Sequence, residues 1–262
     1  MDKNYYQVVK DNWRRIFGNR VLWLFALLAI ANSIYPRSAT RGEFLLLRCV
    51  GFIGSIIAMV VSSMGQVGLI NIANDLVQDV APTFKEVWNR SSGYVIKVIV
   101  LNLILGFLIV FPLLCFLFAS GPDSYQNPLF SFIFWAISIL TVVIGTPSAC
   151  AIVLNDRGIA NSLRIGVRIF INRLWDLIAL GTVYLILPML IAICSYFVLD
   201  TIGYDVTLPS PLSVSMQSYL EIITIRPIAA IVAVVYFLLY PLWVVLITQL
   251  YKDQISEVVL PT

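Results

Sequence analysis

Side chains that could perform acid–base, nucleophilic or metal chemistry are scarce in this chain of 262 residues. The sequence contains no histidine, the residue most used for acid–base catalysis near neutral pH and for binding zinc or haem. The four cysteines lie in apolar stretches without a CxxC or Cys/His spacing, at Cys49, Cys115, Cys150 and Cys194. We expect these cysteines to be ordinary packing residues. The residue types therefore predict a protein without a metal, a cofactor or catalysis.

The acidic residues also argue against the commonest membrane chemistry. Asp75, Asp79, Asp156 and Asp176 all fall near the ends of apolar stretches. None is placed at the middle of a stretch, where proton-coupled pumps carry their acid. The sequence has no phosphate-binding glycine-rich loop, no nucleophile elbow and no basic surface for nucleic acid. We expect no nucleic-acid partner, and we rank a membrane enzyme behind other membrane functions.

The composition is that of an integral membrane protein. Hydrophobic residues make up 60% of the chain and charged residues 12%, with a mean hydropathy of +0.92, unlike soluble domains. A helix that crosses a hydrocarbon core about 30 Å thick needs roughly 20 apolar residues. We predict an all-α protein with a single polytopic membrane domain over residues 1–262. The six predicted spans are approximately 21–35, 44–73, 95–119, 129–154, 174–199 and 228–251.

The first span is short and has two interpretations. Sixteen residues separate Arg20 from Arg37, about 24 Å of helix, so both arginines must snorkel or the bilayer must thin. Alternatively the span is a secretory signal peptide, because basic residues precede it and residues 29–31 resemble a cleavage site. We expect an uncleaved anchor, because the residues before it resemble a structured segment rather than a short basic leader.

The distribution of positive charge predicts the orientation. Counted on alternate sides of the six spans, thirteen of the seventeen Lys and Arg residues lie on one side, and the other side holds Arg37, Arg41, Arg48 and Arg226. Because loops rich in Lys and Arg stay inside, we predict that both termini are cytoplasmic.

The chain contains a predicted threefold internal repeat. Residues 15–20 recur at 168–173 with one mismatch, and residues 10–15 align with 85–90. The same period of 76 residues separates Pro36, Pro112 and Pro188. The repeat units are approximately 1–80, 81–157 and 158–262. Each unit holds an amphipathic segment and a transmembrane hairpin, so three hairpins make six spans.

The three amphipathic segments show helical periodicity, with apolar residues on one face and polar residues on the other. Their predicted apolar faces are Tyr6, Val9, Trp13, Ile16 and Phe17 in the first, Phe84, Val87, Trp88 and Ser91 in the second, and Ile159, Leu163, Val167 and Phe170 in the third. Helices of this kind lie in the membrane interface. We predict that they form a collar around the spans.

The functional interpretation of this collar is binding of anionic lipid in the cytoplasmic leaflet, at about 1 kcal/mol per basic residue. The predicted lipid or partner contacts are Arg14, Arg15, Arg20, Arg164, Arg168 and Arg173, and the predicted interfacial anchors are Trp13, Trp88 and Trp175. The alternative is a structural collar that only fixes the depth of the helices.

The third unit carries a family resemblance. The run Asn155-Asp156-Arg157-Gly158-Ile159-Ala160-Asn161-Ser162-Leu163 leads into a basic helix and then Trp175. With its alternation of amphipathic segments and hairpins, the chain resembles the bacterial six-helix membrane proteins related to the membrane domain of glycerophosphodiester phosphodiesterases and to the YciC-like inner-membrane proteins. The likeness covers nearly the whole chain and is carried by hydropathy and spacing. It implies a multi-pass protein of the bacterial inner membrane, with no established chemistry for this domain.

Polar and small residues inside the spans predict contacts between helices. The polar set is Gln66, Asn71, Asn74, Asn102 and Gln249. When buried, these residues need partners, which makes them either interhelical hydrogen bonds or the lining of a polar pocket. Small residues line the second span at Gly54, Ala58 and Ser62 and the fourth at Thr141, Gly145 and Ala149. They predict close packing within the chain, or else a homo-oligomer.

We therefore expect a non-catalytic membrane protein that acts in membrane or lipid homeostasis or as an accessory subunit of a larger complex. The alternative is a transporter of a small molecule or lipid, which requires a polar cavity that reaches midspan. The longest predicted outer connection, residues 200–227, is where an external protein partner would dock.

Overall fold

The computed structural model describes residues 16–30, 45–78, 80–120, 128–201 and 226–258. These residues form helices and short connecting turns, and no strand occurs among them. The prediction of an all-α chain is confirmed. The predicted contacts Arg14 and Arg15, the anchor Trp13 and most of the 200–227 connection lie outside the described residues.

Five of the described helices are long and apolar enough to cross a membrane. They are α4 (Leu45–Val77), α6 (Val95–Ser120), α7 (Pro128–Asn155), α9 (Leu174–Thr201) and α11 (Arg226–Val258). These helices correspond to the second through sixth predicted spans. The chain is therefore a multi-pass membrane protein.

The first predicted span corresponds to a shorter helix, α2 (Arg20–Ala29). Its ten residues make about 15 Å of helix, roughly half of the hydrocarbon thickness. Asn19 ends the preceding helical turn and caps α2, because its Oδ1 accepts a hydrogen bond from the Leu22 N–H at 3.1 Å. Residues 31–35 of the predicted span lie outside the part of the chain that the structure describes.

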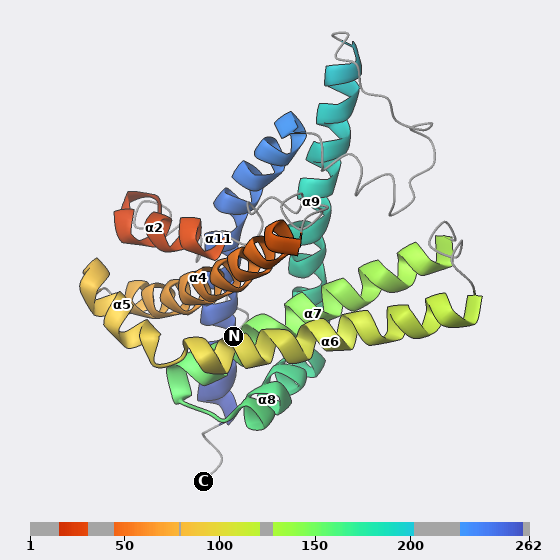
Figure 1. Ribbon diagram of the computed structural model, residues 1–262. Helices are drawn as coiled ribbons and strands as arrows, with labels where there is room; N and C mark the ends of the chain where they lie inside the picture. The colour runs from red at the N-terminus through yellow and green to blue at the C-terminus, as the bar shows by residue number, and fades with distance from the viewer. Residues whose placement is uncertain (1–15, 31–44, 79, 121–127, 202–225, 259–262) are drawn as a thin grey trace.

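Neighbouring helices in the sequence pack together in pairs, α2 on α4, α6 on α7 and α9 on α11. Helix α11 also contacts α2, α4 and α7, and so links all three pairs (Figure 1). The main hydrophobic core lies where the pairs meet, and its fully buried side chains include Phe25, Ile70, Leu101, Ile152 and Ile247.

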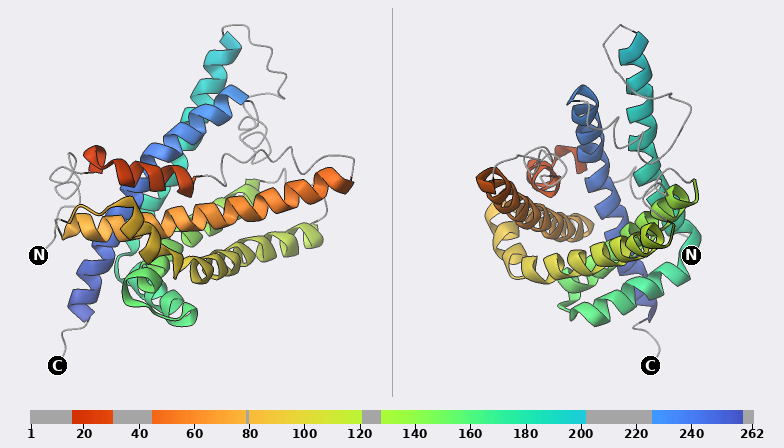
Figure 2. Two further views of the ribbon diagram at one scale, coloured as in Figure 1. Left: turned by 60° about the vertical axis from the view of Figure 1, so that its left-hand side comes forward. Right: turned by 45° about the vertical axis from the view of Figure 1, so that its right-hand side comes forward.

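The pairs converge at one end of the molecule and diverge towards the other (Figures 1 and 2). We call the converging end the collar end, since the two amphipathic helices among the described residues, α5 (Phe84–Ser92) and α8 (Ile159–Asn172), lie there. We call these two the short helices. Away from the collar end, α9 and α11 have a small core of their own, formed by Ala192, Tyr196, Ile228 and Val232.

Each short helix packs on the long helix that precedes it, α5 on α4 and α8 on α7. A capping box starts α5: the Thr83 hydroxyl accepts a bond from the Glu86 N–H, and the Glu86 carboxylate accepts one from the Thr83 N–H. Two residues separate the end of α5 from the start of α6 at Val95, and one residue separates the end of α8 from the start of α9 at Leu174. Such short turns fix each short helix at the end of a long one.

The residues that the short helices bury against their neighbours coincide only in part with the predicted apolar faces. In α5 the buried residues are Val87 and Ser91, whereas Phe84 and Trp88 are exposed. In α8 the buried residues are Ser162, Gly166 and Ile169, and Val167 of the predicted apolar face is exposed.

Close contact with α7 explains the difference in α8. A Cβ atom at Gly166 would lie 2.7 Å from the Ile144 carbonyl oxygen of α7, so only glycine allows this approach. The face that permits the closest packing is therefore the buried one, and larger apolar residues point outward. An outward apolar side chain is favourable at a membrane interface, where it meets lipid rather than water.

Candidate functional site at the collar end

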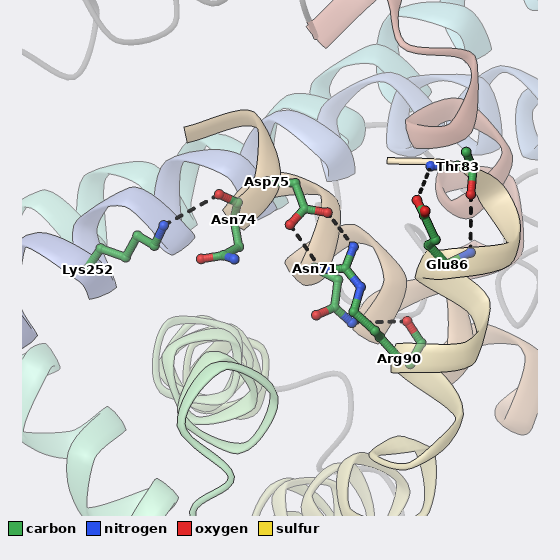
Figure 3. Close-up of polar contacts among 8 residues, drawn as sticks. Asn71, Asn74, Asp75, Thr83, Glu86, Arg90 and Lys252 are labelled. Carbon is green, nitrogen blue, oxygen red and sulfur yellow. Dashed lines mark hydrogen bonds and ion pairs between the residues drawn. The ribbon is translucent and has the colours of Figure 1, made fainter. Parts of the chain in front are cut away.

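Helix α5 is tied to the last turns of α4 by a buried ion pair. Asp75 is 4% exposed, and both of its carboxylate oxygens accept hydrogen bonds from the guanidinium of Arg90, one of them at 3.1 Å (Figure 3). One turn earlier on α4, Asn71 donates from its amide nitrogen to the hydroxyl of Ser91 at 3.1 Å. These two contacts fix the position of α5 on α4.

The charges of α5 are stabilised by these contacts. Hydrogen bonding and the nearby Asp75 carboxylate raise the pKa of Arg90 above its ordinary value. The hydrogen bonds from the backbone and side chain of Thr83 lower the pKa of Glu86 below its ordinary value. Both side chains therefore stay charged at neutral pH. Since Arg90 is already paired with a carboxylate, it is a structural residue rather than a free lipid contact.

Further polar contacts join the remaining helix ends at the collar end. Lys252 on α11 donates to the backbone carbonyl of Asn74 at 3.5 Å, as Figure 3 shows. Lys97 at the start of α6 pairs with Asp156, after α7, at 2.6 Å. The Tyr251 hydroxyl of α11 donates to the side-chain oxygen of Asn155 on α7, and the Asn172 amide of α8 donates to Gln254 of α11 at 3.5 Å. The collar end is therefore held together by polar bonds.

The surface of α8 that faces away from α7 combines positive charge with exposed apolar side chains. Arg164 and Arg168, one turn apart, are both exposed. Beside them Val167 is 40% exposed and Ile171 66% exposed, and Trp175, in the first turn of α9, is 79% exposed. We call these five residues the α8 face.

The two arginines of the α8 face have no carboxylate within salt-bridge distance among the described residues. Their planar donor groups suit phosphate oxygens. The adjacent apolar residues and the tryptophan suit the boundary between head groups and hydrocarbon. The α8 face thus has both chemical features that a phospholipid contact requires.

The other predicted contacts lie elsewhere. Arg173 is paired with Asp176 at 3.8 Å, which reduces its availability to a lipid. Arg20 is exposed at the first residue of α2. Trp88 is 43% exposed and stacks on Phe84 with ring centroids 5.7 Å apart, as an interfacial anchor would.

The predicted polar residues of the spans form separate contacts rather than one cluster. The Asn102 amide of α6 donates to the side-chain oxygen of Gln66 on α4 at 3.1 Å. Asn71 bonds to α5, and Gln249 donates to Asp253 within α11 at 3.2 Å. The Gln66–Asn102 and Asn71–Ser91 bonds favour interhelical packing over a polar permeation path. Among the buried side-chain nitrogen and oxygen atoms of the described residues, the hydroxyl of Ser63 is the one without a hydrogen-bond partner.

The Gln66–Asn102 contact gives a first prediction. Replacing Asn102 by leucine should destabilise the packing of α6 on α4 by about 0.6 kcal/mol, the average for such bonds between membrane helices. The same Asn102 replacement should have no such effect in a chain in which Gln66 is already leucine, because the bond is then already lost. A double-mutant cycle of unfolding free energies in mixed micelles measures it, and two additive single effects would show that the amides do not interact.

Sequence reasoning missed the Asp75–Arg90 pair and the close contact at Gly166. The sequence places Asp75 near the end of an apolar stretch, and its packing beneath α5 makes it buried. No feature of the sequence matches Arg90 to it. Gly166 lies four residues after Ser162, a small-residue spacing that indicates close packing.

The described residues contain no group of three or more potential metal ligands. Comparison of the chain with protein-family models, curated proteins and solved structures finds no match. The resemblance to six-helix inner-membrane proteins therefore remains a prediction, and function must be argued from the geometry of the site.

Proposed function

We propose that this protein is a non-catalytic membrane protein that binds anionic phospholipid on the α8 face and acts in membrane or lipid homeostasis. The observation that carries the proposal is the exposure of Arg164 and Arg168 beside Val167, Ile171 and Trp175. A phosphate group can bridge the two guanidinium groups while the acyl chains cover the apolar residues. If the protein is instead an accessory subunit of a larger complex, the α8 face would bind a partner protein.

We also propose six spans in three repeated hairpins, with the collar end in the cytoplasm of a bacterial inner membrane. The pairing of α2 with α4, α6 with α7 and α9 with α11 supports the hairpins. The repeat is supported by a break in the helix before each hairpin, at Asn19, at residues 93–94 and at Arg173. Exposed cations at the collar end, among them Lys85 and Arg157, agree with a cytoplasmic position.

The test removes the two charges of the α8 face. Replacing Arg164 or Arg168 by glutamine should weaken the affinity for anionic phospholipid about fivefold each, since each basic residue contributes about 1 kcal/mol, and should lower the lipid occupancy accordingly. Native mass spectrometry of the purified full chain measures this occupancy. Lys85→Gln removes one exposed charge from α5 and is the matched control, which should leave the occupancy unchanged.

The outcomes of this experiment distinguish lipid binding on the α8 face from three alternatives. Unchanged phosphatidylglycerol and cardiolipin occupancy in R164Q and R168Q would mean that the collar is only structural. Loss of a copurifying protein, with lipid retained, would mean that the face binds a partner subunit. An equal loss in K85Q would mean that net charge, rather than this face, holds the lipid.

A further inference from the structure

Helices α9 and α11 each contribute one part to the main hydrophobic core and another part to the small core. On α9, Leu177 belongs to the main core and Ala192 to the small one. On α11, Val232 belongs to the small core and Trp243 to the main one. We call the parts that carry the small core, residues 188–201 of α9 and 226–236 of α11, the outer arm.

The outer arm is separated from α6 and α7. Helix α9 packs closely on α7 at Gly181, where a Cβ atom would be 3.0 Å from a methyl carbon of Val143 and 3.6 Å from one of Ile139. The parts of α9 and α11 far from the collar end rise away from the α6 and α7 pair (Figures 1 and 2). The buried residues of the outer arm pack on one another, so the arm is a unit attached at one end.

A proline lies in each helix near the boundary between the cores, Pro188 in α9 and Pro241 in α11. Proline has no N–H, so the helical hydrogen bonds to the carbonyls of Tyr184 and Phe237, four residues earlier, cannot form. Helices bend most readily at such points. Both helices of the arm are thus weakened at the same level.

An aromatic side chain occupies the joint. The Tyr184 ring lies 5.7 Å from that of Tyr236 in the arm and stacks at 5.4 Å on that of Trp243 in the main core. Ring contacts of this kind tolerate several geometries at similar energy. Tyr184 can therefore keep its contacts with both cores if the angle between the outer arm and the main core changes.

We infer that the outer arm moves as one rigid unit about a hinge at Pro188 and Pro241. The motion changes the separation between the outer ends of α9 and α11 and those of α6 and α7, while the collar end stays fixed. Among the described residues, the buried core of the arm is made by α9 and α11 alone, and two backbone bonds are missing at the prolines, so the energetic cost of the motion is low. This hinge is independent of lipid binding on the α8 face.

Pulsed electron–electron double resonance tests the hinge. Pairs of spin labels are attached to cysteines introduced into the otherwise cysteine-free full chain, which is studied in lipid nanodiscs. Spin labels at Val198 on the arm and Phe111 on α6, both exposed, should give a broad distance distribution. Labels at Val198 and Ile231, both on the arm, should give a narrow one, as should labels at Asn89 and Asn161 at the collar end.

Restoring the missing backbone donors should stiffen the joint. In Pro188→Ala/Pro241→Ala, the broad component of the Val198–Phe111 distribution should be lost. Pro147→Ala is the matched control, because Pro147 is a buried proline inside α7 with main-core residues on both sides, and it should leave the distribution broad.

Three results would overturn the inference. A Val198–Phe111 distribution as narrow as the collar pair in the wild type would show that no arm moves. A broad Val198–Ile231 distribution would show that the arm is not rigid. A broad distribution that survives in P188A/P241A, or that P147A also narrows, would place the flexibility elsewhere. The wild-type comparisons hold even if a proline variant fails to fold.

Discussion

Replacing Gly65 by leucine should release α2 from α4 and destabilise the protein by several kcal/mol. The Cβ atom alone would lie 2.1 Å from the backbone nitrogen of Ala29 and 2.7 Å from the carbonyl carbon of Leu28. Backbone atoms cannot rotate away as a side chain can, so the helices must separate. The Ser62 hydroxyl, which donates to the Ala29 carbonyl at 2.5 Å, would lose its partner as well. Overpacking alone costs about 1–3 kcal/mol.

The measurement for this prediction is the free energy of unfolding in mixed micelles, together with the fluorescence of Trp23 on α2. Gly106→Leu in α6 is the matched control, since a Cβ atom there meets nothing within 4 Å. We expect G106L to unfold like the wild type. A G65L variant as stable as G106L would show that α2 does not pack against α4 as described.

Removing Arg90 should destabilise the protein more than removing the charge of Asp75. Arg90→Ala leaves a carboxylate that is 5% exposed without its guanidinium, and an uncompensated buried charge costs about 3–5 kcal/mol. Asp75→Asn leaves a guanidinium that is 45% exposed and can be solvated by water, so its cost should be about 1 kcal/mol. The order of the two effects follows from burial alone.

Unfolding free energies of the two variants measure this order, with Lys85→Ala, an exposed cation on the same helix, as the control. K85A should leave the unfolding free energy nearly unchanged. Equal effects of R90A and D75N at neutral pH would contradict the burial of Asp75.

The long helices could be predicted from the sequence because a membrane span has only one demanding requirement, a sufficient run of apolar residues. The described helices α4, α6, α7, α9 and α11 follow the predicted spans. The short helices α5 and α8 could also be predicted, because polar residues recur on one face at helical spacing. Hydropathy is a local property of the chain, and these elements depend on little else.

Faces and partners could not be predicted, since they depend on which helix comes nearest. Val167 is exposed because Gly166 allows the other face of α8 to reach α7. Asp75 is buried because α5 folds back over the end of α4. Among the predicted polar residues, Gln66 and Asn102 meet across helices, whereas Gln249 bonds within its own helix. These outcomes follow from tertiary packing, which the spacing of residues does not specify.

The central claim is that a phospholipid occupies the α8 face, and photo-crosslinking from Ile171 tests it most directly. Ile171 is 66% exposed beside Arg168, so a photoreactive phenylalanine analogue there samples whatever covers the face without disturbing the core. After irradiation of the full chain in native membranes, mass spectrometry should find adducts of anionic phospholipid that are lost in R164Q/R168Q. Protein adducts, or lipid adducts without preference for anionic head groups and unaffected by R164Q/R168Q, would contradict the claim.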